Sequence, residues 1–306
     1  MYNKRKLISL MLVLMLLVTF MSACTPEAED PVDEDPIVVE DPLDADEVIL
    51  EEVTSFLQSV GSTSYLTSGR EILDLLAINP NAAVLVDMRS PADYEAGHIE
   101  GAINIPYAET GNKLNVLPTD KPVYFVCYSG QTSAQATTIA NLVGIEAYSF
   151  QGGMNFGWST LGEDESTLET TTNPLPEARE LDLSEREQIM WDAATSYFSA
   201  TDNYIVSVAD LSAFVEDNPD AISVLDIRRV DDYTEGHIEG AINIPYAEVG
   251  DNIGSLSANR PIYVVCYSGQ TAGIAKAGLR VAGFNAMSLS RGMIGWNGAE
   301  LPVVTE

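Results

Sequence analysis

The feature that most constrains the fold of this chain of 306 residues is an internal duplication. The segment VLVDMRSPADYEAGHIEGAINIPYAE at 84–109 matches SVLDIRRVDDYTEGHIEGAINIPYAE at 223–248, and KPVYFVCYSGQT matches RPIYVVCYSGQT. The cysteines of the two copies, Cys127 and Cys266, lie 139 positions apart in the same seven residues, VCYSGQT. Solenoid units are about 20–50 residues long, so a repeat of this length predicts two copies of one domain.

Short runs of β-branched and aromatic residues predict the strands of each copy. PVYFVCY and PIYVVCY are the clearest runs, and VLVDM and GAINIP in the first copy are further ones. The segments TSAQATTIANLVG and TAGIAKAGLRVAG follow as predicted helices, with Gly144 and Gly283 in the C-cap position. Strands that alternate with helices predict an α/β fold, in which each copy has a mostly parallel central sheet flanked by helices.

Composition divides the chain further. The net charge is −31, and the stretch from Thr25 to Glu52 holds thirteen Asp or Glu and no Lys or Arg. Such a stretch cannot bury enough apolar surface to fold alone, and it predicts a solvated spacer. Without a basic patch, nucleic acid is not an expected partner. The expected parts are a signal peptide at 1–23, a tether at 24–45, a first domain at 46–161, a linker at 162–183 and a second domain at 184–306.

The N-terminal segment predicts export. Three basic residues precede Leu7–Phe20, which are fourteen residues without charge, a length typical of a signal peptide and short for a membrane span. The following MSAC resembles the lipobox of bacterial lipoproteins, which implies cleavage before Cys24, a lipid on its sulfur and an anchor on the outer face of the bacterial membrane. An ordinary secretory signal, with Cys24 incidental, and a retained signal anchor are the alternatives.

The cysteine loops carry the candidate chemistry. A disulfide between Cys127 and Cys266 would need two equivalent loops to meet face to face, so two free thiols are expected. Each cysteine ends a predicted strand just before a helix, at the sheet edge where ligands bind. Gly130 and Gly269 allow a turn whose backbone N–H groups favour an anion and a nucleophilic thiolate. The alternative is a buried structural cysteine.

Three ordered motifs in each copy resemble the rhodanese-like domain. In the first copy they are VDMR…DYEAGHIEGAINIPY, VYFVCYSGQTSA and QGGMNFGW, and the resemblance covers about 66–160 and 205–300. It implies a sulfurtransferase that passes sulfane sulfur from thiosulfate, polysulfide or a persulfide to cyanide, a thiol or a protein. It also implies that Cys127 and Cys266 carry the sulfur as persulfides, without another cofactor or a metal. The substrate cradle that it implies consists of Tyr128, Ser129, Gly130, Gln131, Thr132, Tyr267, Ser268, Gly269, Gln270 and Thr271.

Two departures from the family pattern bear on substrate and activity. Many members have an Arg or Lys in the loop, whereas this chain has Gln-Thr in both copies, which leaves the donor open. Many tandem members keep a cysteine in one domain only, whereas here both domains have one and both are expected to be active.

The other shared motif residues are expected to be mainly structural. Arg89 and Arg228 are candidates for substrate binding, but an ion pair with Asp87 or Asp226 that ties strand to loop is the favoured role. His98 and His237 are the only histidines of the chain, and one His per domain builds no metal site, so they too are expected to be structural. Trp158 and Trp296 are expected to pack at the edge of the loop.

Two other functions compete with sulfur transfer. A Cdc25-like phosphatase or arsenate reductase shares the fold but needs an Arg that closes a longer loop, and Ser133 and Ala272 stand at that position. A non-enzymatic module on the cell surface, which binds a persulfide, an anion or a protein, is the alternative from another class.

Overall fold

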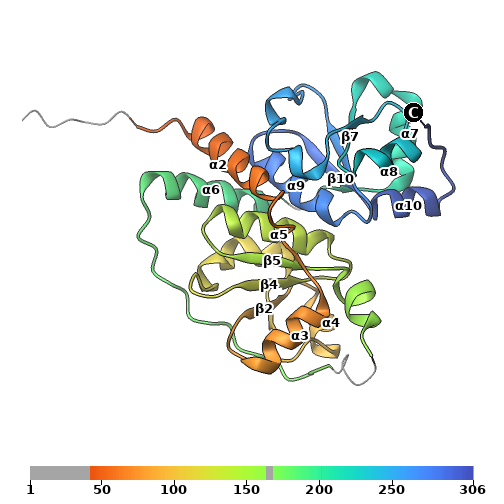
Figure 1. Ribbon diagram of the computed structural model, residues 1–306. Helices are drawn as coiled ribbons and strands as arrows, with labels where there is room; N and C mark the ends of the chain where they lie inside the picture. Colours follow the sequence, from red (N-terminus) through yellow and green to blue (C-terminus); the bar gives the residue numbers. More distant parts are fainter. Residues whose placement is uncertain (1–41, 163–167, 201, 306) are drawn as a thin grey trace, which may run out of the picture. The chain divides into compact units, whose positions relative to one another are not determined.

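Each copy of the repeat folds into a five-stranded sheet in which all neighbouring strands are parallel. The computed structural model describes residues 42–162, 168–200 and 202–305 (Figure 1). The predicted signal peptide, Cys24 and nearly all of the predicted tether lie outside these residues. Within them, no helix is long and apolar enough to cross a membrane.

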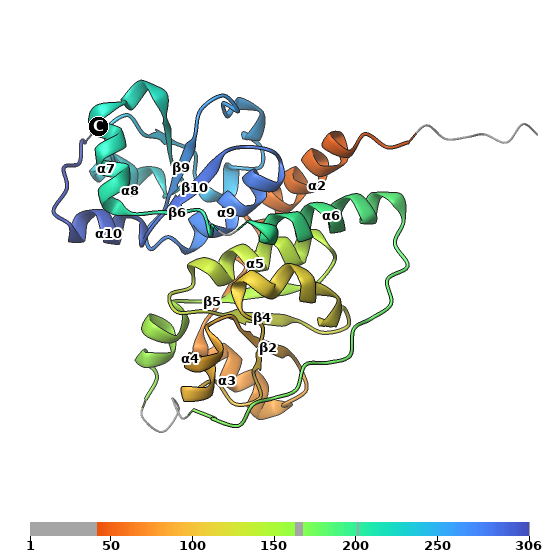
Figure 2. The ribbon, with the colours of Figure 1, turned by 180° about the vertical axis from the view of Figure 1, so that it is seen from behind.

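The first sheet has the strand order β1-β5-β4-β2-β3, so β4, which leads into the cysteine loop, lies at its centre. The views of Figures 1 and 2 agree that α5 covers one face of this sheet and that α3 and α4 cover the other. The elements up to the second repeat are α2 (Ala45–Ser59), β1 (Leu66–Thr67), α3 (Gly69–Ile78), β2 (Val84–Asp87), α4 (Pro91–Ala96), β3 (Ile103–Asn104), the 3-10 helix η1 (Tyr107–Val116), β4 (Val123–Val126), α5 (Gln131–Leu142), β5 (Ala147–Phe150), the π-helical turn η2 (Gly153–Gly157) and the 3-10 turn η3 (Trp158–Thr160).

The second sheet has the equivalent order β6-β10-β9-β7-β8. The predicted class, a parallel α/β fold present twice, is therefore confirmed. The elements of this part are α6 (Glu185–Ser199), β6 (Ile205–Val206), α7 (Val208–Asp217), the 3-10 turn η4 (Pro219–Ala221), β7 (Ser223–Asp226), α8 (Val230–Glu235), β8 (Ile242–Asn243), the 3-10 turns η5 (Tyr246–Glu248) and η6 (Ile253–Ser255), β9 (Ile262–Val265), α9 (Gln270–Val281), β10 (Ala286–Leu289) and α10 (Gly292–Gly298).

Successive side chains of the central strands point to opposite faces, and they divide the core of each repeat into two layers. In β4, Phe125 packs in the layer on the α5 side, whereas Val126 packs in the layer with α3 and α4. In β9, Val264 and Val265 divide in the same way. Burial on both faces explains why these strands are apolar throughout rather than alternating.

The helices that precede the two repeats are exchanged. Helix α2 comes before the first repeat in the chain, yet Phe56 and Leu57 lie in the core layer of the second repeat with Val264. Helix α6 comes before the second repeat, yet its residues Tyr197 and Phe198 pack in the first repeat's layer. Each repeat therefore completes one layer of its core with the helix that precedes the other repeat.

The two repeats also pack directly through α5 and α9, within one compact unit that extends from residue 43 to 306. Small side chains allow a close approach of these helices. A Cβ added to Gly273 would lie 2.8 Å from the carbonyl oxygen of Gln131, and the Thr138 hydroxyl donates to the Ile274 carbonyl at 3.0 Å. This contact explains why α5 is buried although it is rich in Ser, Thr and Ala.

The segment after residue 168 lies along the first repeat. Glu169 pairs with His98 in an antiparallel bridge, and the Arg179 backbone N–H donates to the Asn115 carbonyl at 2.8 Å. Helix α6 then starts after Ser184, whose hydroxyl accepts from the Glu187 N–H while the Glu187 carboxylate accepts from the Ser184 N–H.

Candidate active site: two cysteine loops

Each cysteine lies at the carboxyl end of the central strand of its sheet. The Cys127 Sγ accepts the backbone N–H of Gly130 at 3.1 Å and that of Ser133 at 3.4 Å. In the second repeat, Cys266 Sγ accepts from Gly269 at 3.1 Å and from Ala272 at 3.4 Å. N–H groups aimed at a sulfur stabilise negative charge on it. Both thiols are buried and free, so the expectation of two free thiols is confirmed.

Two features of the loops require glycine at the third position after each cysteine. Gly130 and Gly269 have φ angles of +91° and +89°, in the left-handed region. A Cβ on Gly130 would meet the Gln270 side chain at 2.6 Å, and one on Gly269 would meet the Gln131 side chain at 2.3 Å. The loop of each repeat is thus in contact with a glutamine from the other repeat.

The side chain of each loop glutamine forms hydrogen bonds with the backbone of the other repeat. Gln131 donates its amide N–H to the Leu289 carbonyl at 3.2 Å and accepts the Arg291 backbone N–H at 2.9 Å. Gln270 donates to the Phe150 carbonyl at 3.0 Å and accepts the Gly152 N–H at 3.1 Å. Each glutamine therefore binds the loop that follows the last strand of the other sheet. The two cysteine loops therefore meet across this interface, so the premise on which a disulfide was excluded is wrong, although the thiols themselves are free.

The two sites differ in one contact with sulfur. Ser133 Oγ lies 3.3 Å from Cys127 Sγ and 2.9 Å from Ser149 Oγ, whereas Ala272 occupies the matching position near Cys266. In the sequence, Ser133 and Ala272 had served only as evidence against a phosphatase. Their spacing was an overlooked signal, because a residue six positions after the cysteine lies in the first turn of the following helix, close to the sulfur.

The loop tyrosines and threonines differ in exposure. Tyr128 and Tyr267 are each 41% exposed, and their hydroxyls donate to Asp93 and Asp232. Hydrogen bonds from Ser90 and then Tyr128 lower the pKa of the exposed Asp93. Of the other predicted cradle residues, Ser129, Thr132 and Thr271 are half-buried and Ser268 is exposed.

The two candidate arginines form the expected ion pairs. Arg89 Nη2 lies 2.6 Å from Asp87 Oδ2 and donates to the Gly97 carbonyl, and Arg228 binds Asp226 and the Gly236 carbonyl in the same way. Both guanidinium groups are buried, and these bonds tie the end of a strand to the helix turn that follows it. Their charge is largely balanced by the adjacent aspartate.

The histidines and tryptophans are part of the packing. His98 stacks on Tyr94 with ring centroids 3.7 Å apart, and His237 stacks on Tyr233 at the same distance. Trp158 and Trp296 are buried in the apolar layers. These contacts agree with the structural roles expected for the four residues.

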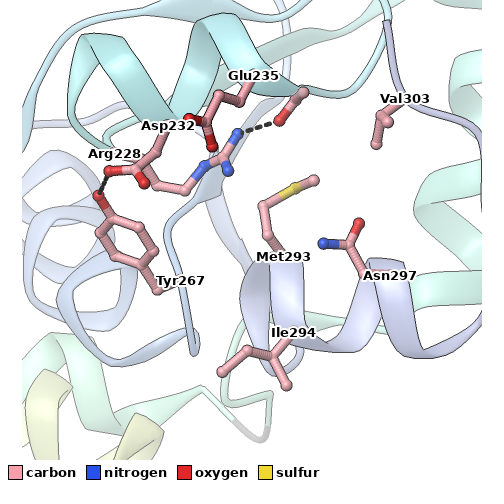
Figure 3. A pocket seen from close by; sticks show the side chains of 9 residues that line it. Arg228, Asp232, Glu235, Tyr267, Met293, Ile294, Asn297 and Val303 are labelled. Atoms are coloured by element: carbon pink, nitrogen blue, oxygen red, sulfur yellow. Dashed lines mark hydrogen bonds between the residues drawn. The ribbon is translucent and has the colours of Figure 1, made fainter.

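Two cavities adjoin the cysteine loops. One, of about 380 Å³, lies beside the Cys266 loop and is lined by Arg228, Asp232, Glu235 and Tyr267 among others (Figure 3). The other, of about 270 Å³, is a cleft between the repeats. It is lined by Ser129, Gln151, Gly152, Phe156, Ser268, Gln270, Arg291 and Ile294. Since Ser129 and Ser268 each stand two positions after a cysteine, the cleft adjoins both loops.

The sequence is similar to a known protein family and to several of its members. The chain matches the model of the rhodanese-like domain twice, at residues 70–159 and 207–299. It is 38% identical over 88 residues to the thiosulfate sulfurtransferase GlpE of Pseudomonas entomophila, which is 28% of this chain and 79% of that protein. It is 40% identical over 72 residues to the uncharacterized protein YqhL of Bacillus subtilis, 23% of this chain and 57% of that protein.

A solved structure is also similar. The rhodanese-related protein of Thermoplasma volcanium is 29% identical, with a TM-score of 0.31, and the match covers 33% of this chain and 97% of that one. The chain spans about half the length of the Bacillus subtilis relatives that it matches.

Proposed function

Because this chain belongs to the rhodanese-like domain family, we propose that it is a sulfurtransferase that carries sulfane sulfur as persulfides on Cys127 and Cys266. Relatives that are named thiosulfate sulfurtransferases support the sulfurtransferase family. The observation that carries the proposal for these two residues is the pair of backbone N–H groups that each sulfur accepts.

The proposed reaction has two displacement steps on the same sulfur. The cysteine thiolate attacks the outer sulfur of thiosulfate, and the bond between the two donor sulfurs breaks. Sulfite leaves with the electron pair, and the cysteine becomes a persulfide anion. Cyanide or a thiolate acceptor then attacks the terminal sulfur, so that thiocyanate or a new persulfide leaves and the cysteine thiolate is regenerated. A polysulfide or a low-molecular-weight persulfide donates in the same way.

The loop supplies what both states of the cysteine need. The thiolate and the persulfide each carry one negative charge, and the N–H groups of the loop are fixed before either forms, so little reorganisation is required during the transfer. Both repeats have this arrangement, which supports activity in both.

The test is intact mass after incubation with thiosulfate or polysulfide. A chain that starts at residue 25 lacks Cys24 and keeps every described residue. We expect a gain of one sulfur, about 32 Da, per loop cysteine, removed by cyanide. The Cys127→Ser and Cys266→Ser variants should each keep one adduct. No adduct from a folded and reduced protein with either donor would contradict the proposal and favour the non-enzymatic binding module.

We also propose that the chain is exported and anchored by a lipid on Cys24. The proposal is supported by the uncharged run Leu7–Phe20 before MSAC and by the acidic stretch after it. In a bacterial host fed a labelled fatty acid, the full chain should take up label and the Cys24→Ser variant should not. Equal labelling of the two would contradict it.

A further inference from the structure

The cleft between the repeats contains a cation that the cysteine loops themselves lack. Among the described residues that line it, Arg291 is the only charged one. The residue follows β10 and stands where the first repeat has Gly152, in the aligned segments SRGM and QGGM. The site is therefore asymmetric: one arginine, from the second repeat, serves a cleft that both cysteine loops adjoin.

The position of Arg291 is held by the first repeat. Its φ angle is +58°, an uncommon conformation for a residue with a side chain. Its backbone N–H donates to the Gln131 side chain at 2.9 Å, and its guanidinium lies 5.4 Å from the ring centroid of Phe156. Contacts with Gln131 and Phe156 thus place this exposed side chain at the boundary between the repeats.

The cavity of Figure 3 has the opposite charge. Arg228 is neutralised there by Asp226, and Asp232 is paired with Arg229 at 3.1 Å, whereas Glu235 adds a negative charge to the lining. A dianion such as thiosulfate is repelled by Glu235, and also by most of a chain whose net charge is −31. Of these two cavities, only the cleft with Arg291 offers an anion a charge of opposite sign.

We infer that anionic sulfur donors reach both cysteine loops through the cleft between the repeats, and that Arg291 is the residue that binds them. The inference rests on the proposed function, because it concerns the donor of that reaction. Neither cysteine loop has an Arg or Lys of its own, so the positive charge for an anionic donor comes instead from Arg291, in the segment after β10. Arg291 is a specificity-determining residue here, and the persulfide chemistry remains with the cysteines.

Thiosulfate binding is measured first without turnover, by calorimetry on a protein in which both loop cysteines are serine. We expect Arg291→Gln to weaken thiosulfate binding about tenfold, since a hydrogen-bonded charge pair is lost, and Arg291→Lys to keep most of the affinity. In the protein with both cysteines, Arg291→Gln should raise the KM for thiosulfate by a similar factor and change kcat little.

Two control variants locate the effect. Arg260→Gln removes the same charge at an exposed residue bound to the Asp220 carbonyl, and it should leave affinity unchanged. Glu235→Gln removes a negative charge from the cavity of Figure 3 and should also have little effect. The inference is overturned if Arg291→Gln binds thiosulfate normally, or if Glu235→Gln tightens binding as much as Arg291→Gln weakens it. Persulfide formation by intact mass is read separately, so a failure of the proposed function is distinguishable from a failure of the anion site.

Discussion

At the scale of single residues, the glycine of each loop has two separate requirements. Gly130 needs a positive φ, and it also needs the absence of a Cβ because Gln270 lies against it. Gly144, at the end of α5, shares only the first requirement: its φ is +77°, and nothing lies within 4 Å of an added Cβ. A comparison of substitutions at Gly130 and Gly144 therefore distinguishes the cost of backbone strain from the cost of a steric clash.

We therefore predict that Gly130→Ala destabilises the protein more than Gly144→Ala. The control should lose about 1 kcal/mol of unfolding free energy from backbone strain alone, and Gly130→Ala about 2 kcal/mol or more, because the Gln270 side chain must also move. Urea denaturation of both variants measures the difference. Equal losses would show that the contact with Gln270 costs nothing.

At the scale of elements, the exchanged helices connect stability across the repeats. Leu57 on α2 is fully buried among residues of the second repeat, although it precedes the first repeat in the chain. Leu50, on the same helix, is 44% exposed. A substitution of a buried α2 residue should therefore destabilise the second repeat, against which α2 packs, more than the first repeat, which follows α2 in the chain.

Leu57→Ala should cost about 2–5 kcal/mol, as expected for a fully buried leucine. Hydrogen exchange should increase most in β9 and α9 of the second repeat, while Leu50→Ala should change little. If the amides of the first repeat were the ones to lose protection, the packing of α2 on the second repeat would be wrong.

The sequence determines which elements form more directly than it determines which elements pack together. The central strands and α5 could be predicted because their signals are local: apolar runs, and glycines with positive φ at either end of the helix. The partners of α2 and α6 could not, because an apolar helix face specifies that it is buried but not against which of two similar sheets. In the site, the turn after each cysteine could be predicted from Gly130 and its counterpart. The hydrogen bonds of Gln131 to the other repeat, and the position of Arg291 in the cleft, could not, because both depend on how the repeats pack.

At the scale of the whole molecule, a buried lysine lies in the contact between the repeats. Lys276 on α9 is fully buried and donates to the Tyr197 hydroxyl and to the Asn203 carbonyl, both at 3.0 Å. Burial, followed by the nearby Arg280, holds the pKa of Lys276 well below its ordinary value, while Asp202 opposes this shift. The unfolded chain therefore binds a proton more readily than the folded chain at this residue.

This lysine should make stability rise with pH. Between its lowered folded pKa and the ordinary value of 10.5, the unfolded state binds more protons, so deprotonation favours the folded state. Relative to Lys276→Met, the Tm of the unsubstituted protein should increase as the pH is raised through that window. A difference in Tm between the two proteins that stays constant with pH would contradict a depressed pKa.

The helix exchange has a consequence for the order in which the chain is made. Synthesis proceeds from the N-terminus, so α2 leaves the ribosome long before α9 and the sheet that it covers exist. Phe56 has an early partner in Tyr65 of the first repeat, with ring centroids 4.9 Å apart, but Leu57 lacks its partners on β9 and α9 until nearly the whole chain has emerged. The first repeat gains α6 much earlier. Folding of the second repeat is thus coupled to completion of synthesis, and a nascent chain that stalls early exposes an apolar helix that a chaperone would have to cover.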